Sequence, residues 1–229
     1  LRRLAAEGAI ARRARSTEPT FSVPAHLSLL SGVGPELHGV FSEALEFTPE
    51  MNRLEPVFRV GLRRGRTTAA VIDGAGHLAR FDEILQCRLA FGFDALETVS
   101  DRASGVIDAA LARLASDAPE LLFLHLPDVD LAGHAHGWGS PEYGAAVLEV
   151  DAALGRLLPS LSDETLLIVL STHGGGGALG AFQHGSTSAE DIEVPLVLHG
   201  AGVRGGTELA KVELLDVAPT VGWALGWAP

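Results

Sequence analysis

The chain has 229 residues, of which 47% are hydrophobic, and it contains 27 glycines and 12 prolines. This length is enough for one large domain or for one domain with a small insertion, and the composition is typical of a soluble α/β protein and has no signature of intrinsic disorder. The formal net charge of −12 argues against a surface that binds nucleic acid polymers. No apolar run approaches the roughly 18 residues of a membrane span.

The single cysteine, Cys87, excludes an internal disulfide and is expected to be a small core residue. Lys211 is the only lysine, and this bias toward arginine indicates a GC-rich bacterial source. The visible sequence favours a cytoplasmic location, and any secretion signal would lie before Leu1.

The first half of the chain is predicted to mix short helices and strands within one domain, residues 1–229. Residues 1–14 have a helical apolar pattern. A short helix is predicted to begin near Pro24, with Ser22 as its N-cap, because proline is favoured in a first turn. Residues 67–73 form a short apolar run that suits a strand. The least regular segments fall within 42–101, where we expect a small cap or insertion.

The second half shows a clearer alternation of strands and helices. The apolar runs 121–126, 165–171 and 194–200 predict buried strands, the first of them parallel. Helical patterns cover 103–116, 140–161 and 214–226, and the second of these helices is predicted to have Ser140 as N-cap and Pro141 in its first turn. The alternation predicts an α/β fold with a mostly parallel central sheet and helices on both faces.

In open α/β sheets, ligands bind beyond the carboxyl ends of the strands. The stretch PDVDLAGHAHG, residues 127–137, directly follows one predicted strand. Asp130 and His134 are four residues apart, so one helical turn would bring a carboxylate and an imidazole together as a pair of ligands for a divalent metal. Asp128 and His136 are nearby alternatives. The competing interpretation is an acidic turn with solvated histidines.

A glycine-rich loop follows the predicted strand 165–171. His173 begins this loop and His184 stands near its end. Glycines allow the backbone to turn sharply and to approach a ligand closely; alternatively, the loop is flexible and its histidines are incidental. Since no cysteine lies in these segments, a metal here would have nitrogen and oxygen ligands, which suits zinc, with manganese or magnesium as alternatives.

Ser22 has two interpretations. As an N-cap it would stabilise its helix by roughly 0.5–2 kcal/mol. As a nucleophile, its hydroxyl would lie beside the positive end of a helix, where phosphate also binds well. Sequence spacing does not decide between the two.

Three ordered blocks give the chain a resemblance to a known family. They are PTFSVPAHLSLLSGVGPELHGV (19–40), PDVDLAGHAHGWGSPEYGAAVLEVDAALGRLL (127–158), and THGG through QHG (172–185) followed by EVPLVLHG. In their order and spacing they resemble the alkaline phosphatase superfamily, most closely its type I phosphodiesterase/nucleotide pyrophosphatase branch. The sulfatase branch is disfavoured because His26 replaces the arginine of its C/S-x-P-x-R pattern.

The resemblance implies an alkaline-phosphatase-like fold and a metal-dependent hydrolase that acts on small phosphate esters or nucleotides. It assigns Ser22 as the nucleophile. It assigns Asp130, His134 and His184 to one metal, most often zinc. Of the ligands of a second metal, it identifies Ser22 and His173.

Three departures from the family pattern stand out. Thr172 occupies the position of a usual metal-ligating aspartate, and its neutral hydroxyl is a poorer ligand for a dication. Glu43 stands where phosphodiesterases often have an asparagine that donates to the phosphoryl oxygen; an ionised carboxylate cannot donate and repels phosphate. The usual Asp-Gly pair after the first strand has no match, so we expect that strand upstream of residue 1.

The leading hypothesis is therefore a phosphate ester hydrolase with Ser22 as nucleophile. The alternative is a degenerate, weakly active or inactive member of the family that serves as a binding or structural protein, which Thr172 and Glu43 motivate. A metal-independent serine hydrolase is a weaker third hypothesis, because the chain lacks a G-x-S-x-G nucleophile elbow.

Overall fold

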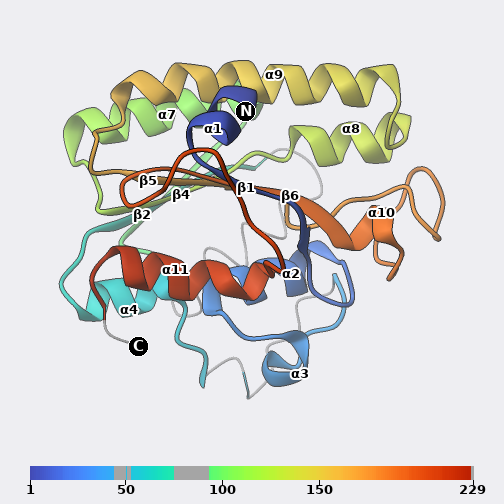
Figure 1. The fold of residues 1–229 in the computed structure, drawn as a ribbon, viewed down its shortest axis with the longest axis horizontal. Helices are drawn as coiled ribbons and strands as arrows, with labels where there is room; N and C mark the ends of the chain where they lie inside the picture. The colour runs from blue at the N-terminus through green and yellow to red at the C-terminus, as the bar shows by residue number, and fades with distance from the viewer. Residues whose placement is uncertain (44–49, 51–52, 75–92, 228–229) are drawn as a thin grey trace. The chain divides into compact units, whose positions relative to one another are not determined.

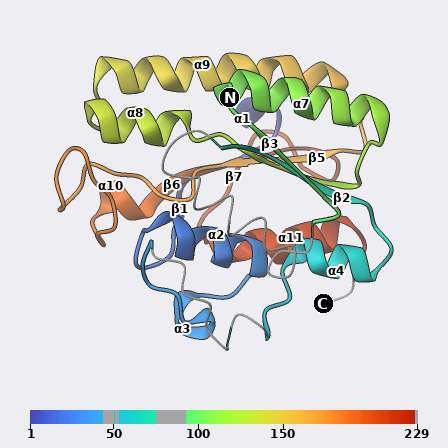
Figure 2. The same cartoon turned by 180° about the vertical axis from the view of Figure 1, so that it is seen from behind.

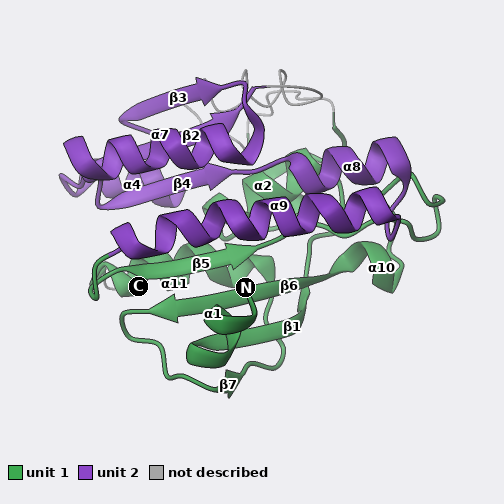
Figure 3. Cartoon of the chain, turned by 90° about the horizontal axis from the view of Figure 1, so that it is seen from above, with its two compact units in different colours: residues 1–51, 162–229 green, residues 52–161 purple. Residues whose placement is uncertain are grey.

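The computed structural model describes residues 1–43, 50, 53–74 and 93–227. The chain divides into two compact units: unit 1 comprises Leu1–Met51 and Ser162–Pro229, and unit 2 comprises Asn52–Leu161 (Figure 3). Both units combine a β-sheet with helices, so the predicted α/β class is confirmed. The expected core position of Cys87 lies outside the described residues.

The sheet of unit 1 has the strand order β5-β6-β1-β7. Strand β6 is antiparallel to both of its neighbours, whereas β1 and β7 are parallel. Because β6 is antiparallel to both, β1 and β5 run in the same direction, and their carboxyl ends lie at the same edge of the sheet. The strands are β1 (Ala9–Arg15), β5 (Leu166–Leu170), β6 (Glu193–Gly200) and β7 (Thr207–Glu208).

The amino-terminal segment departs from the helix that the pattern over residues 1–14 predicts. Helix α1 covers only Arg2–Glu7, and the chain then forms β1. A side chain at Gly8 would collide with the backbone of Leu198 in β6, so the close approach of the strands requires glycine there. The apolar residues of β1 are three small alanines and Ile10, and the pairing of this strand with β6, remote in sequence, outweighs the local helical period.

Helices lie on both faces of the unit 1 sheet, with α1 on one face and α2 and α11 on the other (Figures 1 and 2). Leu4, Leu27 and Leu214 are fully buried and anchor α1, α2 and the turn before α11 in the core. The remaining elements of unit 1 are α2 (Ser22–Ser31), α3 (Pro35–His38), α10 (Ala189–Ile192), the 3₁₀ turn η3 (Leu214–Asp216) and α11 (Val217–Ala224).

The sheet of unit 2 is wholly parallel, with the order β3-β2-β4. Every residue of the central strand β2 is buried. Helices α7 and α4 pack on opposite faces of the sheet (Figures 1 and 2). The elements are α4 (Val57–Arg63), β2 (Thr68–Asp73), β3 (Ala95–Val99), α7 (Arg102–Ser116), β4 (Leu121–His125), α8 (Asp128–His136), α9 (Pro141–Leu157) and the 3₁₀ turn η2 (Leu158–Ser160).

Helix α9 begins as its sequence predicts. The Ser140 hydroxyl accepts the Tyr143 N–H at 3.1 Å, and Pro141 is the first helical residue. Such a cap satisfies one of the backbone donors that a helix leaves unpaired at its start.

Part of the predicted cap or insertion within 42–101 lies outside the described residues. The described remainder builds α4, β2 and β3. Among the described helices, none combines the length and the apolar character needed to cross a membrane.

Candidate functional site

The candidate nucleophile and a histidine meet at one edge of the unit 1 sheet. Ser22 begins α2 after β1 ends, and His173 follows the end of β5. Ser22 Oγ lies 2.9 Å from His173 Nε2, a hydrogen-bonding distance. Both residues therefore lie beyond strand ends that share one edge, where α/β proteins usually bind ligands.

The two histidines of the glycine-rich loop are fixed by backbone carbonyls. His173 Nδ1 donates to the Gly174 carbonyl at 2.9 Å, and His184 Nδ1 donates to the Thr20 carbonyl at 2.9 Å. Because a carbonyl only accepts, Nδ1 carries the proton and Nε2 presents the lone pair in each neutral ring. The rings are buried and stack with centroids 3.8 Å apart.

Asp191 and two close backbone contacts hold this loop in shape. The fully buried Asp191 carboxylate accepts the N–H groups of Gly177 and Ser186 at 3.1 and 2.8 Å. The Gly174 N–H donates to the Asp191 carbonyl, and a side chain at Gly174 would collide with the Glu190 carbonyl. The loop is thus built against α10.

Ser22 is not the N-cap that the sequence predicts. Helix α2 begins at Ser22 itself, and the N-cap residue Phe21 makes no side-chain cap. The cap comes from Glu43 instead: its Oε1 accepts the Ser22 N–H at 2.7 Å and its Oε2 accepts the Val23 N–H at 3.2 Å. The Ser22 hydroxyl is consequently directed to His173 rather than used in capping.

Thr172 precedes His173 at the position where the resemblance calls for an aspartate. Its carbonyl accepts the Ser16 hydroxyl, and the Ser171 hydroxyl donates to the His173 carbonyl. These contacts fix the backbone on both sides of the threonine side chain. At this position, therefore, the chain has a neutral hydroxyl in place of the carboxylate that the resemblance calls for.

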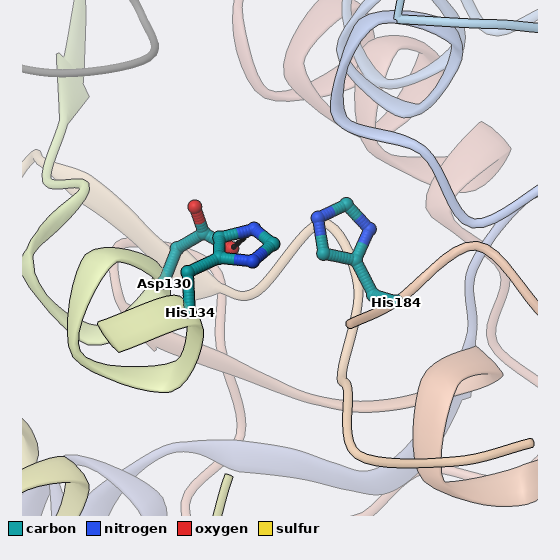
Figure 4. Close-up of side chains that lie close together, drawn as sticks. All are labelled: Asp130, His134 and His184. Atoms are coloured by element: carbon teal, nitrogen blue, oxygen red, sulfur yellow. Dashed lines mark ion pairs between the residues drawn. The ribbon is translucent and has the colours of Figure 1, made fainter. Parts of the chain in front are cut away.

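The motif that follows β4 forms helix α8 of unit 2, so its four-residue spacing places two polar side chains on one helical face. Asp130 Oδ1 lies 3.6 Å from His134 Nε2, and both side chains are half-buried (Figure 4). The predicted pairing of this carboxylate and imidazole is present. Such a pair offers one nitrogen and one oxygen donor of the kinds that divalent metals bind.

The two alternative ligands of the motif have other positions. Asp128 is buried, and its Oδ1 accepts the Ala103 N–H at 3.1 Å, so it caps helix α7. His136 is exposed at the end of α8.

Trp138 is a neighbour of the motif that sequence reasoning missed. Its ring meets the His134 ring edge-on, with centroids 5.0 Å apart. A side chain at Gly133 would overlap the indole, so glycine lets Trp138 pack against α8. Tyr143 lies beyond it; burial, and then the Asp130 charge, raise the pKa of Tyr143 and keep its phenol neutral. Only the glycine beside His134 hinted at this packing.

The sequence profile of the type I phosphodiesterase / nucleotide pyrophosphatase family matches residues 1–186, which contain every site residue described above. The chain belongs to this family. It is therefore a member of the alkaline phosphatase superfamily, and the activity of its family is the hydrolysis of phosphate esters.

Curated relatives of this family member are distant and longer. An uncharacterised pyrophosphatase/phosphodiesterase of Schizosaccharomyces pombe is 27% identical over 186 residues, covering 68% of this chain and 36% of the relative. Ectonucleotide pyrophosphatase/phosphodiesterase 1 of Saccharomyces cerevisiae is 26% identical over 209 residues, covering 68% of this chain and 27% of the relative. The chain thus aligns with about a third of the length of these proteins.

A solved structure has the same fold. Murine ectonucleotide pyrophosphatase / phosphodiesterase 5, solved as an inactive variant in complex with AMP, matches with a TM-score of 0.75 at 16% identity. The match covers 99% of this chain and 89% of that one. The similarity confirms the alkaline-phosphatase-like fold.

Proposed function

We propose that this family member is a metal-dependent hydrolase of phosphate esters, of the phosphodiesterase type, with Ser22 as its nucleophile. The observation that carries the proposal is the 2.9 Å distance between Ser22 Oγ and His173 Nε2 at the start of α2. A hydroxyl beside a lone-pair nitrogen can lose its proton as it attacks, and a helix N-terminus favours the anionic phosphoryl group.

In the first step Ser22 Oγ attacks phosphorus, and its proton passes to His173 Nε2. The new O–P bond forms while the bond to the leaving oxygen breaks, which leaves a phosphorylated Ser22. In the second step water attacks phosphorus, leaving its hydroxyl on the phosphate and releasing its other proton to solvent, while the O–P bond to Ser22 breaks and Ser22 Oγ takes its proton back from His173 Nε2. His173 keeps its orientation throughout because its Nδ1 donates to the Gly174 carbonyl.

The ligands we propose for one divalent metal are Asp130, His134 and His184, the side chains drawn in Figure 4. Their chemistry fits the ion: each histidine can offer Nε2, and Asp130 offers a carboxylate oxygen. The Thr20 carbonyl fixes the tautomer of His184, as outer-shell partners of metal-binding histidines commonly do. A metal bound there, most often zinc in such sets, supplies Lewis-acid stabilisation of charge on the phosphoryl and leaving oxygens.

A second metal position is poorly supported by this chain's described residues. The resemblance assigns Ser22 and His173 to it, and the adjacent Thr172 adds no charge. Without a carboxylate, this donor set balances little of a dication's charge. The proposed activation of Ser22 therefore rests on His173.

The alternative function is a non-catalytic binding or structural role. One observation favours it: Glu43 holds the two backbone N–H groups at the start of α2, where a phosphoryl oxygen would be expected. A purified protein that binds zinc and hydrolyses neither an aryl phosphate monoester nor a diester would support this alternative.

The proposed function is tested with 4-nitrophenyl phosphate and bis(4-nitrophenyl) phosphate in the presence of zinc, manganese or magnesium. We expect metal-dependent release of nitrophenol that falls by roughly a thousandfold or more in Ser22→Ala. Ser160→Ala, which changes an exposed serine, is the matched control and should retain full activity. Undiminished hydrolysis by Ser22→Ala would exclude Ser22 as the nucleophile.

A further inference from the structure

Glu43 lies against the two groups that a phosphate ester would be expected to need. Its carboxylate accepts the Ser22 N–H at 2.7 Å and the Val23 N–H at 3.2 Å. These are the first two N–H groups of α2, a helix of 10 residues. They have no partners within their own helix, and the helix dipole makes them an attractive place for an anion.

The same residue, Ser22, offers its N–H to Glu43 and its hydroxyl to His173. A phosphorus atom within bonding reach of Ser22 Oγ has its non-bridging oxygens close to the Ser22 N–H. A substrate and the Glu43 carboxylate would therefore compete for these donors. When the substrate displaces the Glu43 carboxylate from these N–H groups, the carboxylate remains within the length of one glutamate side chain of the bound phosphate.

Among the residues that the structure describes, no cation is paired with the charge of Glu43. Across residues 1–43, 50, 53–74 and 93–227, Glu43 makes no ion pair with arginine or lysine; its contacts are the two backbone N–H groups. The side chain is exposed, so it can leave α2 without opening the core. The negative charge of Glu43 consequently repels any anion that binds to the Ser22 and Val23 N–H groups in place of the carboxylate.

On this geometry, and resting on the proposed function, we propose that Glu43 is a specificity-determining residue that selects diesters over monoesters. A phosphate diester carries one negative charge, whereas a monoester carries nearly two at pH 7, since its second pKa is about 6. Repulsion by a nearby carboxylate grows in proportion to the charge of the substrate. Glu43 therefore weakens the binding of both esters, because it competes for the N–H groups. It weakens the binding of the monoester more, because the monoester carries the larger negative charge.

The test compares Glu43→Gln with the unaltered protein in kcat/KM for 4-nitrophenyl phosphate and for bis(4-nitrophenyl) phosphate at pH 7. Glutamine keeps the size of the side chain and removes its charge. We expect the ratio of monoester to diester kcat/KM to rise about tenfold. Glu208→Gln removes an exposed charge from β7 in the same unit and should leave the ratio unchanged. An unchanged ratio in Glu43→Gln would overturn the proposal.

Two further measurements separate this proposal from the proposed function. Glu43→Asp retains the charge and should keep the original selectivity; a shift as large as that of Glu43→Gln would overturn the electrostatic argument. If no variant hydrolyses either ester, calorimetric binding of inorganic phosphate decides: tighter binding to Glu43→Gln supports the role of Glu43 although the hydrolase proposal fails, and equal binding overturns it. Ser22-dependent hydrolysis with unchanged selectivity overturns only the role of Glu43.

Discussion

Ser22 Oγ and His173 Nε2 lie 2.9 Å apart although 151 positions separate the two residues in the chain. The first follows β1 and the second follows β5, and both strands end at one edge of the unit 1 sheet. The fold thus places a nucleophile beside an acceptor for its proton.

The first prediction concerns His173 as the proton acceptor. His173→Gln should lower kcat for the aryl diester by roughly a hundredfold to ten-thousandfold, the usual contribution of a general base, with a smaller change in KM. His199→Gln, at the end of β6, is the control and should retain kcat. Steady-state kinetics provide the measurement, and an unchanged kcat in His173→Gln would show that another group accepts the proton.

The second prediction concerns the proposed metal ligands. His134→Ala and Asp130→Ala should each weaken zinc binding about tenfold or more, because each removes one of the three protein ligands we propose. His136→Ala changes the exposed histidine of the same helix and should bind zinc normally. Zinc is titrated against a competing chromophoric chelator; equal affinities for His134→Ala and His136→Ala would contradict the ligand set.

The third prediction concerns the packing of Trp138 on α8. Gly133→Ala should reduce the free energy of unfolding by about 1–3 kcal/mol, because the added methyl group overlaps the indole. Gly144→Ala in α9 meets no atom within 4 Å and should instead stabilise the protein by roughly 0.5–1 kcal/mol, as alanine does in a helix interior. Urea unfolding of both variants compares the two glycines; a stabilised Gly133→Ala would contradict the close contact.

The fourth prediction is a pH dependence of stability that comes from His38. Burial lowers the pKa of His38 below its ordinary value of 6.5. Its Nδ1 accepts the Val40 N–H at 3.2 Å, so the neutral ring is the one that fits the fold. A group with a lowered folded pKa contributes stability that is complete above the unfolded pKa and is lost as pH falls toward the folded one.

His38→Gln should therefore flatten the loss of stability as pH falls below about 6.5. The urea midpoint at two values on either side of that pH, 8.0 and 5.5, is the measurement. His136→Gln should retain the dependence of the unaltered protein. A steeper loss in His38→Gln would contradict the sign of the shift.

The fifth prediction addresses Thr172. If the neutral threonine weakens a second metal position, Thr172→Asp should bind additional zinc and hydrolyse the diester faster than the unaltered protein. Thr172→Val, which lacks the hydroxyl and adds no charge, is the matched control. A Thr172→Asp variant with unchanged zinc content would indicate that the lost carboxylate is not what limits the site.

The proximity of two candidate metal ligands could be predicted from the sequence because the two residues are close together in the chain. Asp130 and His134 are four residues apart, and a helix brings such residues to one face whatever the rest of the fold does. The position of His173 beyond a strand end was predictable for a similar reason, since the strand before it is visible as an apolar run. The strand before Ser22 was not predicted, because residues 1–14 have a helical pattern.

Contacts between residues remote in sequence were less predictable. Residues 9–15 look helical by themselves and become β1 through pairing with β6. Glu43 was visible as an unusual residue, but its hydrogen bonds to the start of α2 depend on how the chain returns after α3. Nothing in the spacing indicated that this carboxylate, rather than Ser22, would cap the helix.

The proposed mechanism requires that Ser22 Oγ form a bond to phosphorus. The decisive measurement is mass spectrometry of protein quenched in acid during turnover of bis(4-nitrophenyl) phosphate, with Ser22→Ala treated in parallel. We expect a nitrophenyl phosphate adduct on the peptide that contains Ser22 and no adduct on the corresponding peptide of the variant. Rapid turnover by the unaltered protein without any adduct, together with equal turnover by Ser22→Ala, would contradict it.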